Sequence, residues 1–113
     1  MSINVSDVGK VILVNAGYDL SGNSELSLVF LKPDGTTKVT KTTADGVSAP
    51  TTAASVTVDG EAVSFAANEY FSYVVEAGLF DTSGAWKVQG IYADATPKNL
   101  AGDFAEFSVF ARL

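Results

Sequence analysis

Cysteine and histidine are both missing from this sequence of 113 residues, and each absence removes a class of function. Without cysteine the chain has no disulfide, no thiol nucleophile and no thiolate ligand for zinc. Without histidine it lacks the commonest general base near neutral pH, which is also a frequent metal ligand. The fold must therefore be held by packing alone, and the lack of disulfides suits assembly in a reducing cytoplasm.

Basic residues are also scarce. Seven Lys and Arg stand against thirteen Asp and Glu, which gives a formal net charge of −6. Nucleic-acid binding gains affinity from clustered basic side chains, but here the basic residues are scattered, apart from Lys32, Lys38 and Lys41 around one turn. We interpret these three as a solvated strand edge, where lysine discourages unwanted strand pairing. We expect no nucleic-acid partner.

Long apolar runs are absent as well. No window approaches the ~20 residues of a membrane-spanning helix. Residues 1–7 have neither the basic start nor the apolar run of a signal peptide. With 47% hydrophobic and 18% charged residues, the composition is that of a folded protein. We expect a single domain over residues 1–113, no signal peptide and no membrane partner.

The pattern that is present has a period of two. Residues 11–14 are apolar on both faces, which predicts a strand covered on both sides. In residues 25–32 one face carries Leu26, Leu28 and Phe30, which predicts a strand with a core-facing side. Residues 37–43 are polar and rich in β-branched side chains, which indicates an edge strand.

A turn joins these last two strands. Lys32-Pro33-Asp34-Gly35 is typical of a type I turn, because Pro33 sets φ at its second position and Gly35 supplies the left-handed residue. The register stays open: a three-residue loop pairs Val29 with Val39, and a two-residue loop pairs Phe30 with Val39. In an immunoglobulin-like fold the two strands can also lie in opposite sheets.

Residues 54–65 give the clearest hairpin, because Asp59-Gly60 is a favoured two-residue turn with positive φ at both positions. This turn fixes three pairs: Val58 with Glu61, Val56 with Val63, and Ala54 with Phe65. We predict a core face made of Val56, Val58, Val63 and Phe65. The preceding residues 44–54 are small and rich in turn formers, so we expect a mobile loop that packs poorly.

The remaining strands are predicted at residues 70–75, 86–92 and 104–111, the second with Trp86, Val88, Gly90 and Tyr92 on one face. Residues 76–80 cross between strands with at most one helical turn, and residues 94–99 form a turn. Seven or eight strands at regular spacing, with no substantial helix, predict an all-β fold: an immunoglobulin-like antiparallel β-sandwich.

Asp81-Thr82-Ser83-Gly84-Ala85-Trp86 is typical of the corner that opens a strand in such sandwiches. These domains often place an acidic residue, a glycine and, two residues later, a tyrosine whose hydroxyl bonds back to the chain. Here tryptophan replaces the tyrosine, and Asp81 lies one residue further back than usual. We expect Trp86 and Val88 in the core, and the indole N–H of Trp86 can replace the hydroxyl as donor.

These motifs, taken in order, resemble a family. Asp7-x-Gly9, Gly17-x-Asp19-Leu20-Ser21, Lys32-Pro33-Asp34-Gly35 and Asp81-x-Ser83-Gly84-x-Trp86-Lys87-Val88-Gln89 together look like the small immunoglobulin-like virion proteins of tailed bacteriophages. The resemblance covers residues 7–35 and 78–110. It implies a non-enzymatic structural protein, made in the host cytoplasm and carried in the virion. Such a part docks in symmetric copies onto other virion proteins, at a baseplate, tail or neck, or as capsid decoration.

Catalytic and metal sites have weak candidates. Asp59 and Glu61 flank a turn tip, where solvated charges are more usual than a glycosidase pair. Serine has no histidine to activate it, and no Ser-x-x-Lys is present. Loop-tip carboxylates could offer oxygen ligands to calcium, but the spacing of a calcium loop is missing from Asp45, Asp59, Asp94 and Asp103. We expect no enzyme and no cofactor.

Two surfaces are candidates for docking. Phe104 and Phe110 lie on the outer face of the last strand if Phe107 and Val109 point inward, and an exposed aromatic pair at a sheet edge suits a partner groove or strand addition. The alternative is that a loop or the N-terminal segment covers them. Residues 1–9 are either an arm ordered against a neighbour or a frayed terminus.

A second function remains open. A carbohydrate- or receptor-binding β-sandwich would stack sugar rings on tyrosine, and the candidates are Tyr18, Tyr70, Tyr73 and Tyr92. Aromatic side chains on strands are more often part of the core.

Overall fold

The computed structural model describes residues 3–16, 18–58, 60–94, 99–101 and 105–111. Within these ranges the protein is all-β, with one 3-10 turn (η1, Thr43–Asp45) and no α-helix. The strands are β1 (Ile3–Asn4), β2 (Val11–Asn15), β3 (Asn23–Leu31), β4 (Lys38–Thr42), β5 (Ala54–Val58), β6 (Glu61–Phe65), β7 (Tyr70–Val74), β8 (Gly84–Asp94), β9 (Asn99–Ala101) and β10 (Ala105–Phe110). The sequence pattern missed β1 and β9, because strands of two or three residues are too short to show a period of two.

The larger sheet has the strand order β1-β10-β8-β3-β4, and β9 also pairs with β8. Its pairs are antiparallel except β1–β10, which is parallel and joins the N-terminal segment to the last strand. β8 lies between β3 on one side and β10 and β9 on the other. Its alternation confirms the prediction, because Trp86, Val88 and Tyr92 are buried together on one face.

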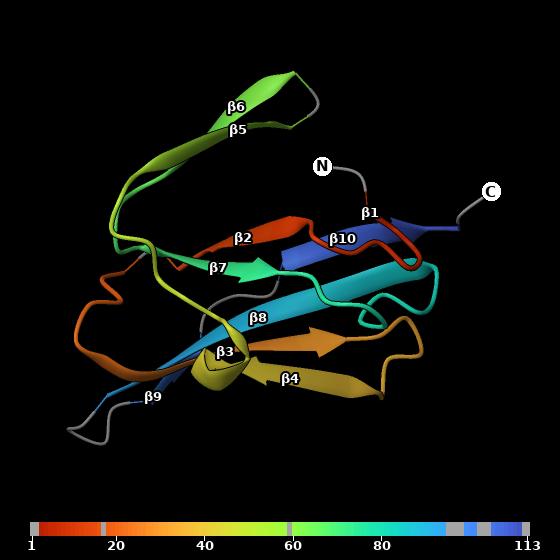
Figure 1. Ribbon diagram of the computed structural model, residues 1–113, viewed down its shortest axis with the longest axis horizontal. Helices are drawn as coiled ribbons and strands as arrows, with labels where there is room; N and C mark the ends of the chain where they lie inside the picture. The colour runs from red at the N-terminus through yellow and green to blue at the C-terminus, as the bar shows by residue number, and fades with distance from the viewer. Residues whose placement is uncertain (1–2, 17, 59, 95–98, 102–104, 112–113) are drawn as a thin grey trace.

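The pair β2–β7 forms a second layer across the inner face of the larger sheet (Figure 1). The layers come close at Gly90, where an added Cβ would lie 2.3 Å from the ring of Phe71. Facing side chains of the two layers fill the core, among them Ile12, Val14, Phe71 and Tyr73 on one side and Leu26, Leu28, Phe30, Trp86 and Val88 on the other. The fold is therefore layered like a sandwich.

The prediction that residues 11–14 are covered on both sides is wrong. Ile12 and Val14 are buried, but Val11 on the opposite face is exposed. Val74, its cross-strand partner in β7, is exposed as well. An apolar run cannot tell which of its two faces meets another layer, and in the described part of the chain only the inner face of β2–β7 does.

The β3–β4 connection settles the open register. Phe30 pairs with Val39 in one sheet, which is the register of the two-residue loop. The turn is as predicted: the Gly35 N–H donates to the Lys32 carbonyl at 3.0 Å, and Gly35 has φ +76. The Asp34 carboxylate accepts from the backbone N–H groups of Thr36 and Thr37, each at 2.8 Å. β4 ends the strand order, which confirms it as an edge.

The hairpin β5–β6 has the predicted register but not the predicted burial. All three expected pairs are present. Val56 and Val63, placed in the core by the sequence, are each 37% exposed, whereas Phe65 is buried. The side chain of Val58, the fourth residue of that face, lies outside the described part of the structure. Phe65 packs on Tyr70 with ring centres 5.4 Å apart. The two strands form a sheet of their own that projects away from the two layers (Figure 1).

The segment before the hairpin packs better than its composition predicted. Val47 is buried, and Ser48 forms an isolated bridge with Ser72 of β7 through backbone hydrogen bonds of 3.0 and 2.8 Å. The expectation of poor packing is therefore wrong at Val47 and Ser48, whereas most of the other residues of the segment are exposed. Residues 76–80 form a turn without a helix, and the predicted turn at 94–99 falls largely on residues 95–98, outside the described ranges.

Candidate docking surfaces

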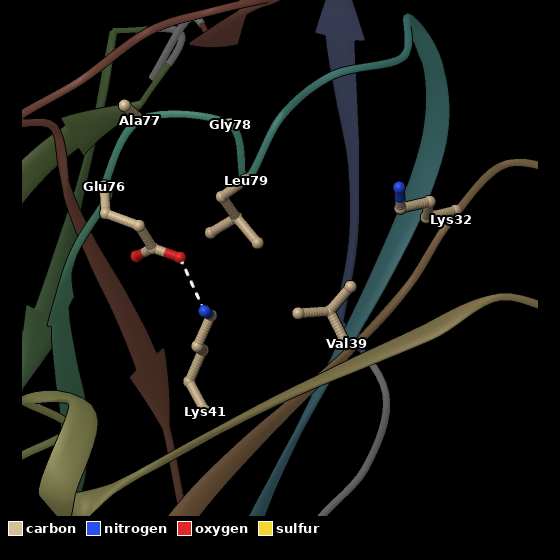
Figure 2. A pocket seen from close by; sticks show the side chains of 7 residues that line it. All are labelled: Lys32, Val39, Lys41, Glu76, Ala77, Gly78 and Leu79. Atoms are coloured by element: carbon tan, nitrogen blue, oxygen red, sulfur yellow. Dashed lines mark ion pairs between the residues drawn. The ribbon is translucent and has the colours of Figure 1, made fainter.

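A shallow cavity of ≈ 230 Å³ lies between β4 and the turn that follows β7, and Lys41 and Glu76 are among the side chains that line it (Figure 2). Lys41 Nζ lies 2.7 Å from Glu76 Oε1. The hydroxyl of Tyr73 donates to the other oxygen of the same carboxylate. Burial would raise the pKa of Glu76, but the hydrogen bonds from Lys41 and Tyr73 outweigh it and hold the pKa below its usual value.

The hydrogen bond to Glu76 also affects the pKa of Tyr73. Burial raises the pKa of Tyr73, and the neighbouring Glu76 carboxylate raises it further. The three groups thus satisfy one another, with the lysine and the carboxylate charged and the phenol neutral. This arrangement ties β4 and β7 together and gives the cavity a structural role.

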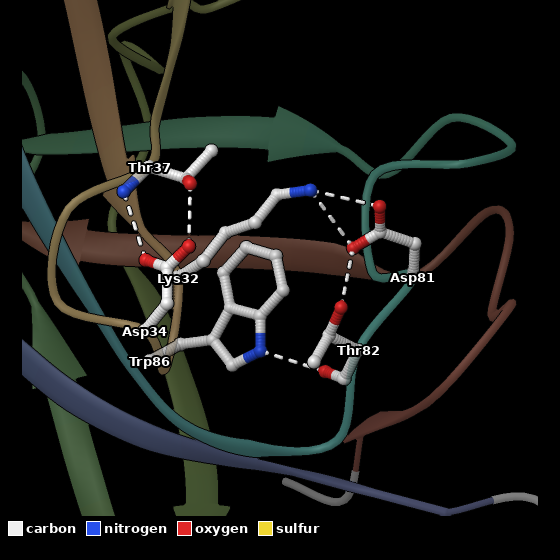
Figure 3. Close-up of polar contacts among 6 residues, drawn as sticks. All are labelled: Lys32, Asp34, Thr37, Asp81, Thr82 and Trp86. Atoms are coloured by element: carbon white, nitrogen blue, oxygen red, sulfur yellow. Dashed lines mark hydrogen bonds and ion pairs between the residues drawn. The ribbon is translucent and has the colours of Figure 1, made fainter.

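The predicted corner is assembled around Trp86 (Figure 3). The indole is fully buried, and its Nε1–H donates to the Thr82 carbonyl at 2.9 Å. The indole N–H therefore makes a hydrogen bond back to the preceding turn, as the sequence indicated. The ring of Phe80 meets the indole edge-on at 5.2 Å, and Phe107 stacks on it at 6.3 Å.

Two motifs far apart in the sequence meet at this corner (Figure 3). Lys32 Nζ lies 2.8 and 3.0 Å from the carboxylate oxygens of Asp81 and 6.0 Å from the centre of the Trp86 ring. The hydrogen bond from Lys32 lowers the pKa of Asp81. Gly84 has φ +133, and an added Cβ there would lie 2.9 Å from Pro33 Cγ. The corner residues Asp81, Gly84, Trp86 and Val88 therefore have a structural role: Trp86 and Val88 are buried, Asp81 pairs with Lys32, and Gly84 lies against Pro33.

Phe110 is the described member of the predicted aromatic pair, and it is 55% exposed. Val109 is buried and Phe107 packs against the core, so the alternation along β10 is confirmed. Phe104 lies outside the described residues. The end of β10 is not an open edge, because β1 pairs with it at Val109 and Phe110. The Phe110 ring is available to a partner, whereas strand addition at this point is blocked by the chain itself.

The N-terminal segment is attached to its own domain. Ile3 is buried, and the Val5 N–H donates to the Phe110 carbonyl at 2.8 Å. The Ser6 N–H donates to the Phe80 carbonyl at 2.9 Å, and the Gly9 N–H to the Val75 carbonyl at 2.8 Å. Residues 3–9 thus lie along β10 and β7, neither as a detached arm nor as a frayed end.

The hairpin β5–β6 is the surface that sequence reasoning missed. Its strands are exposed on both faces from Ser55 to Thr57 and from Glu61 to Ser64. A cavity of ≈ 570 Å³ opens at its base and is lined by Asn15, Ala53, Ala54, Ser55, Ser64, Phe65, Ala66 and Glu69. The sequence did hold a signal: the second face carries only small or hydroxylated side chains, Ser55, Thr57, Ala62 and Ser64, and Phe65 is the one large side chain available to anchor the first.

Three of the four candidate sugar-binding tyrosines do not present a ring to solvent, because Tyr70, Tyr73 and Tyr92 are buried. Tyr18 is half-buried and meets Tyr92 edge-on at 6.2 Å. Among the described residues no group of three acidic side chains is placed to hold a metal ion. Asp59 and Asp103 lie outside those residues, and Asp45 and Asp94 accept hydrogen bonds from Thr42 and Tyr92.

No helix within the described ranges has the length and apolar character needed to cross a membrane. Comparison of the chain with protein-family models, with curated proteins and with solved structures found no match.

Proposed function

We propose that this chain is a non-enzymatic structural protein of a phage virion, an immunoglobulin-like domain that docks in symmetric copies onto other virion proteins. Its place is a neck, a tail or baseplate, or the capsid surface. The observation that carries the proposal is the β5–β6 hairpin, which projects from the body with Val56 and Val63 exposed. A two-stranded hairpin is at best marginally stable alone in water, so its most natural role is to pack against another protein.

The strand order supports the immunoglobulin-like assignment. In such domains strands B and E share one sheet, while G, F, C and C′ are neighbours in the other. Here β2–β7 has the place of B and E, and β10-β8-β3-β4 has the place of G, F, C and C′. Trp86 then stands near the start of the strand equivalent to F, where the tyrosine corner occurs. The hairpin β5–β6 is an addition between C′ and E.

The chemistry of the surface also favours docking over the carbohydrate-binding alternative. The stacking of sugar rings on tyrosine needs an aromatic face in solvent, and three of the candidate tyrosines are buried. The exposed large apolar side chains are mostly valines, which suit a protein partner: Val8, Val11, Val56, Val63, Val74 and Phe110.

Mass spectrometry of purified phage particles tests the proposal. We expect the chain in a fixed number of copies per particle, and we expect the double variant Val56→Ser with Val63→Ser to be strongly depleted from particles. Val74→Ser is the control, because it removes a valine that is even more exposed, 56% against 37%, from the body rather than the hairpin. Particles that lack the wild-type chain would overturn the proposal.

A further inference from the structure

Strand edges differ sharply in how they are protected. An exposed edge invites pairing with another chain unless charge, proline or a covering segment blocks it. β4 carries Lys38 and Lys41, β10 is paired by β1, and β7 is bridged by Ser48. β5 has the sequence Ala-Ser-Val-Thr-Val, with no charge and no proline, and β2 likewise has neither. Within the described ranges it pairs with β6 alone.

β5 also belongs to a two-stranded sheet whose valines Val56 and Val63 are not covered by a second layer. β2 pairs with one strand too, but its Ile12 and Val14 are buried in the core between the layers. The hairpin has no such layer: Phe65 anchors its base, and Val56 and Val63 remain exposed. Three or more strands with an apolar face are needed for independent stability. A further strand beside β5 would supply this.

The distribution of charge bears on whether a second copy of this chain can supply that strand. The chain has a net charge of −6, so two copies repel each other across most surfaces. β5 has no ionisable side chain, whereas β6 begins with Glu61. A contact between two β5 strands therefore brings no like charges directly opposite each other, so a second copy of this acidic chain is tolerated at this edge.

We propose that β5 is a self-association strand, which pairs antiparallel with β5 of a second copy across a twofold axis at Val56. In this register Ser55 of each copy lies opposite Thr57 of the other. The product is a four-stranded sheet with the order β6-β5-β5-β6, and its apolar face joins Val56, Val63 and Phe65 of both copies. The contact is isologous, as expected for a closed dimer. It goes beyond the proposed function and stands without it.

Single cysteine variants test this register, because the chain has no cysteine of its own. Two residues opposite each other at the axis have Cα atoms about 4.5–5.5 Å apart, within the range of about 4.4–6.8 Å that a disulfide spans. Val56→Cys should therefore form a covalent dimer under mild oxidation. Val63→Cys is the matched control: across the four-stranded sheet its copies are on the order of 14 Å apart, three strand spacings, so it should remain monomeric.

Sedimentation of the unmodified chain gives an independent reading. A contact through one short strand is small, so we expect a dimer fraction that rises with concentration and dissociates on dilution. Val56→Lys should reduce this fraction at least tenfold. Val74→Lys, at a more exposed valine on the body, should leave it unchanged. Equal cross-linking of Val56→Cys and Val63→Cys, or a chain that is monomeric at all concentrations, would overturn the inference. Neither result bears on whether the chain is present in virions.

Discussion

Trp86 connects three parts of the molecule that are distant in the sequence. Its N–H bonds to Thr82 in the turn before its own strand, and its ring meets Phe80 and, on β10, Phe107. The bond to Thr82 spans four residues and was expected from the corner motif, because it depends on local chain geometry. The ion pair between Lys32 and Asp81 spans 49 residues and was not expected, because no local pattern records which distant strands become neighbours.

Replacing the indole by a smaller ring tests the corner. Trp86→Phe removes the donor to Thr82 and leaves a gap between Phe80 and Phe107. We expect a loss of about 1–3 kcal/mol in the free energy of unfolding, from one hydrogen bond and a partial cavity. Urea denaturation measures this. Phe110→Ala, a change at an exposed ring, serves as the control and should cost less than about 0.5 kcal/mol. Equal midpoints for the two variants would contradict the account.

Gly84 provides a second test at the same corner. Gly84→Ala places a Cβ 2.9 Å from Pro33 Cγ at φ +133, so the chain must both strain and shift. Gly78→Ala has a positive φ of +86 but open space around it. We expect Gly84→Ala to lower the melting temperature more than Gly78→Ala does. The opposite order would show that the approach of Pro33 is not what requires glycine.

The lowered pKa of Asp34 should make the free energy of unfolding depend on pH in the acid range. Hydrogen bonds from the Thr37 hydroxyl and from the backbone N–H groups of Thr37 and Thr36 lower its pKa from 3.8 to about 2. A lowered folded-state pKa contributes stability that is present above the unfolded value and is lost as the pH falls through the folded one. Between pH 3.8 and about 2 the wild type should therefore lose stability through this group, and Asp34→Asn should not.

Urea denaturation across that pH range measures the difference between the two chains. Thr37→Val is an intermediate variant, because it removes the hydroxyl donor but keeps both backbone donors. Its loss of stability should begin at the same pH as in the wild type, but it should be smaller and should end at a higher pH, because the folded-state pKa of Asp34 lies closer to the unfolded value. Parallel curves for the wild type and Asp34→Asn would contradict the assignment of the acid sensitivity to this turn.

At the scale of elements, the turns and the strand pairs next to them could be predicted from the sequence. Which strand faces are covered by another layer could not. The turn Pro33-Asp34-Gly35 was predicted and observed, and so were the pairs around the Asp59-Gly60 turn. Register follows from the turn because the turn fixes which residues come opposite each other. Burial of Val56 and Val63 depends on whether another layer lies over them, which alternation does not encode. The candidate docking hairpin was missed for this reason.

Removal of the hairpin tests whether it is an addition to a complete body. Ala54 and Phe65 are paired, so residues 54–65 can be replaced by a Gly-Gly link between Ala53 and Ala66. We expect a folded protein that loses about 2–4 kcal/mol, from the burial of Phe65 and its ring contact with Tyr70. Thermal unfolding and the near-ultraviolet signal of Trp86 measure this. Loss of cooperative unfolding would show that the hairpin is part of the core.

At the scale of the whole molecule, a rigid two-layer body carries one projecting element. The body is held by core packing and by the corner, and its polar groups near cavities, such as Lys41, Glu76 and Tyr73, are engaged with one another. Sequence patterns predicted the all-β class and most strands of that body. They did not predict the parallel pairing of β1 with β10, because two residues at a terminus carry no periodic signal.

The most direct test of the docking role is a cryo-electron microscopy map of the purified phage particle. The account predicts repeated copies of this domain at one symmetric site, with β5–β6 buried against a neighbouring protein and Trp86 enclosed between the two layers. A map in which the domain is absent, or in which it is held by another face while the hairpin stands in solvent, would contradict it.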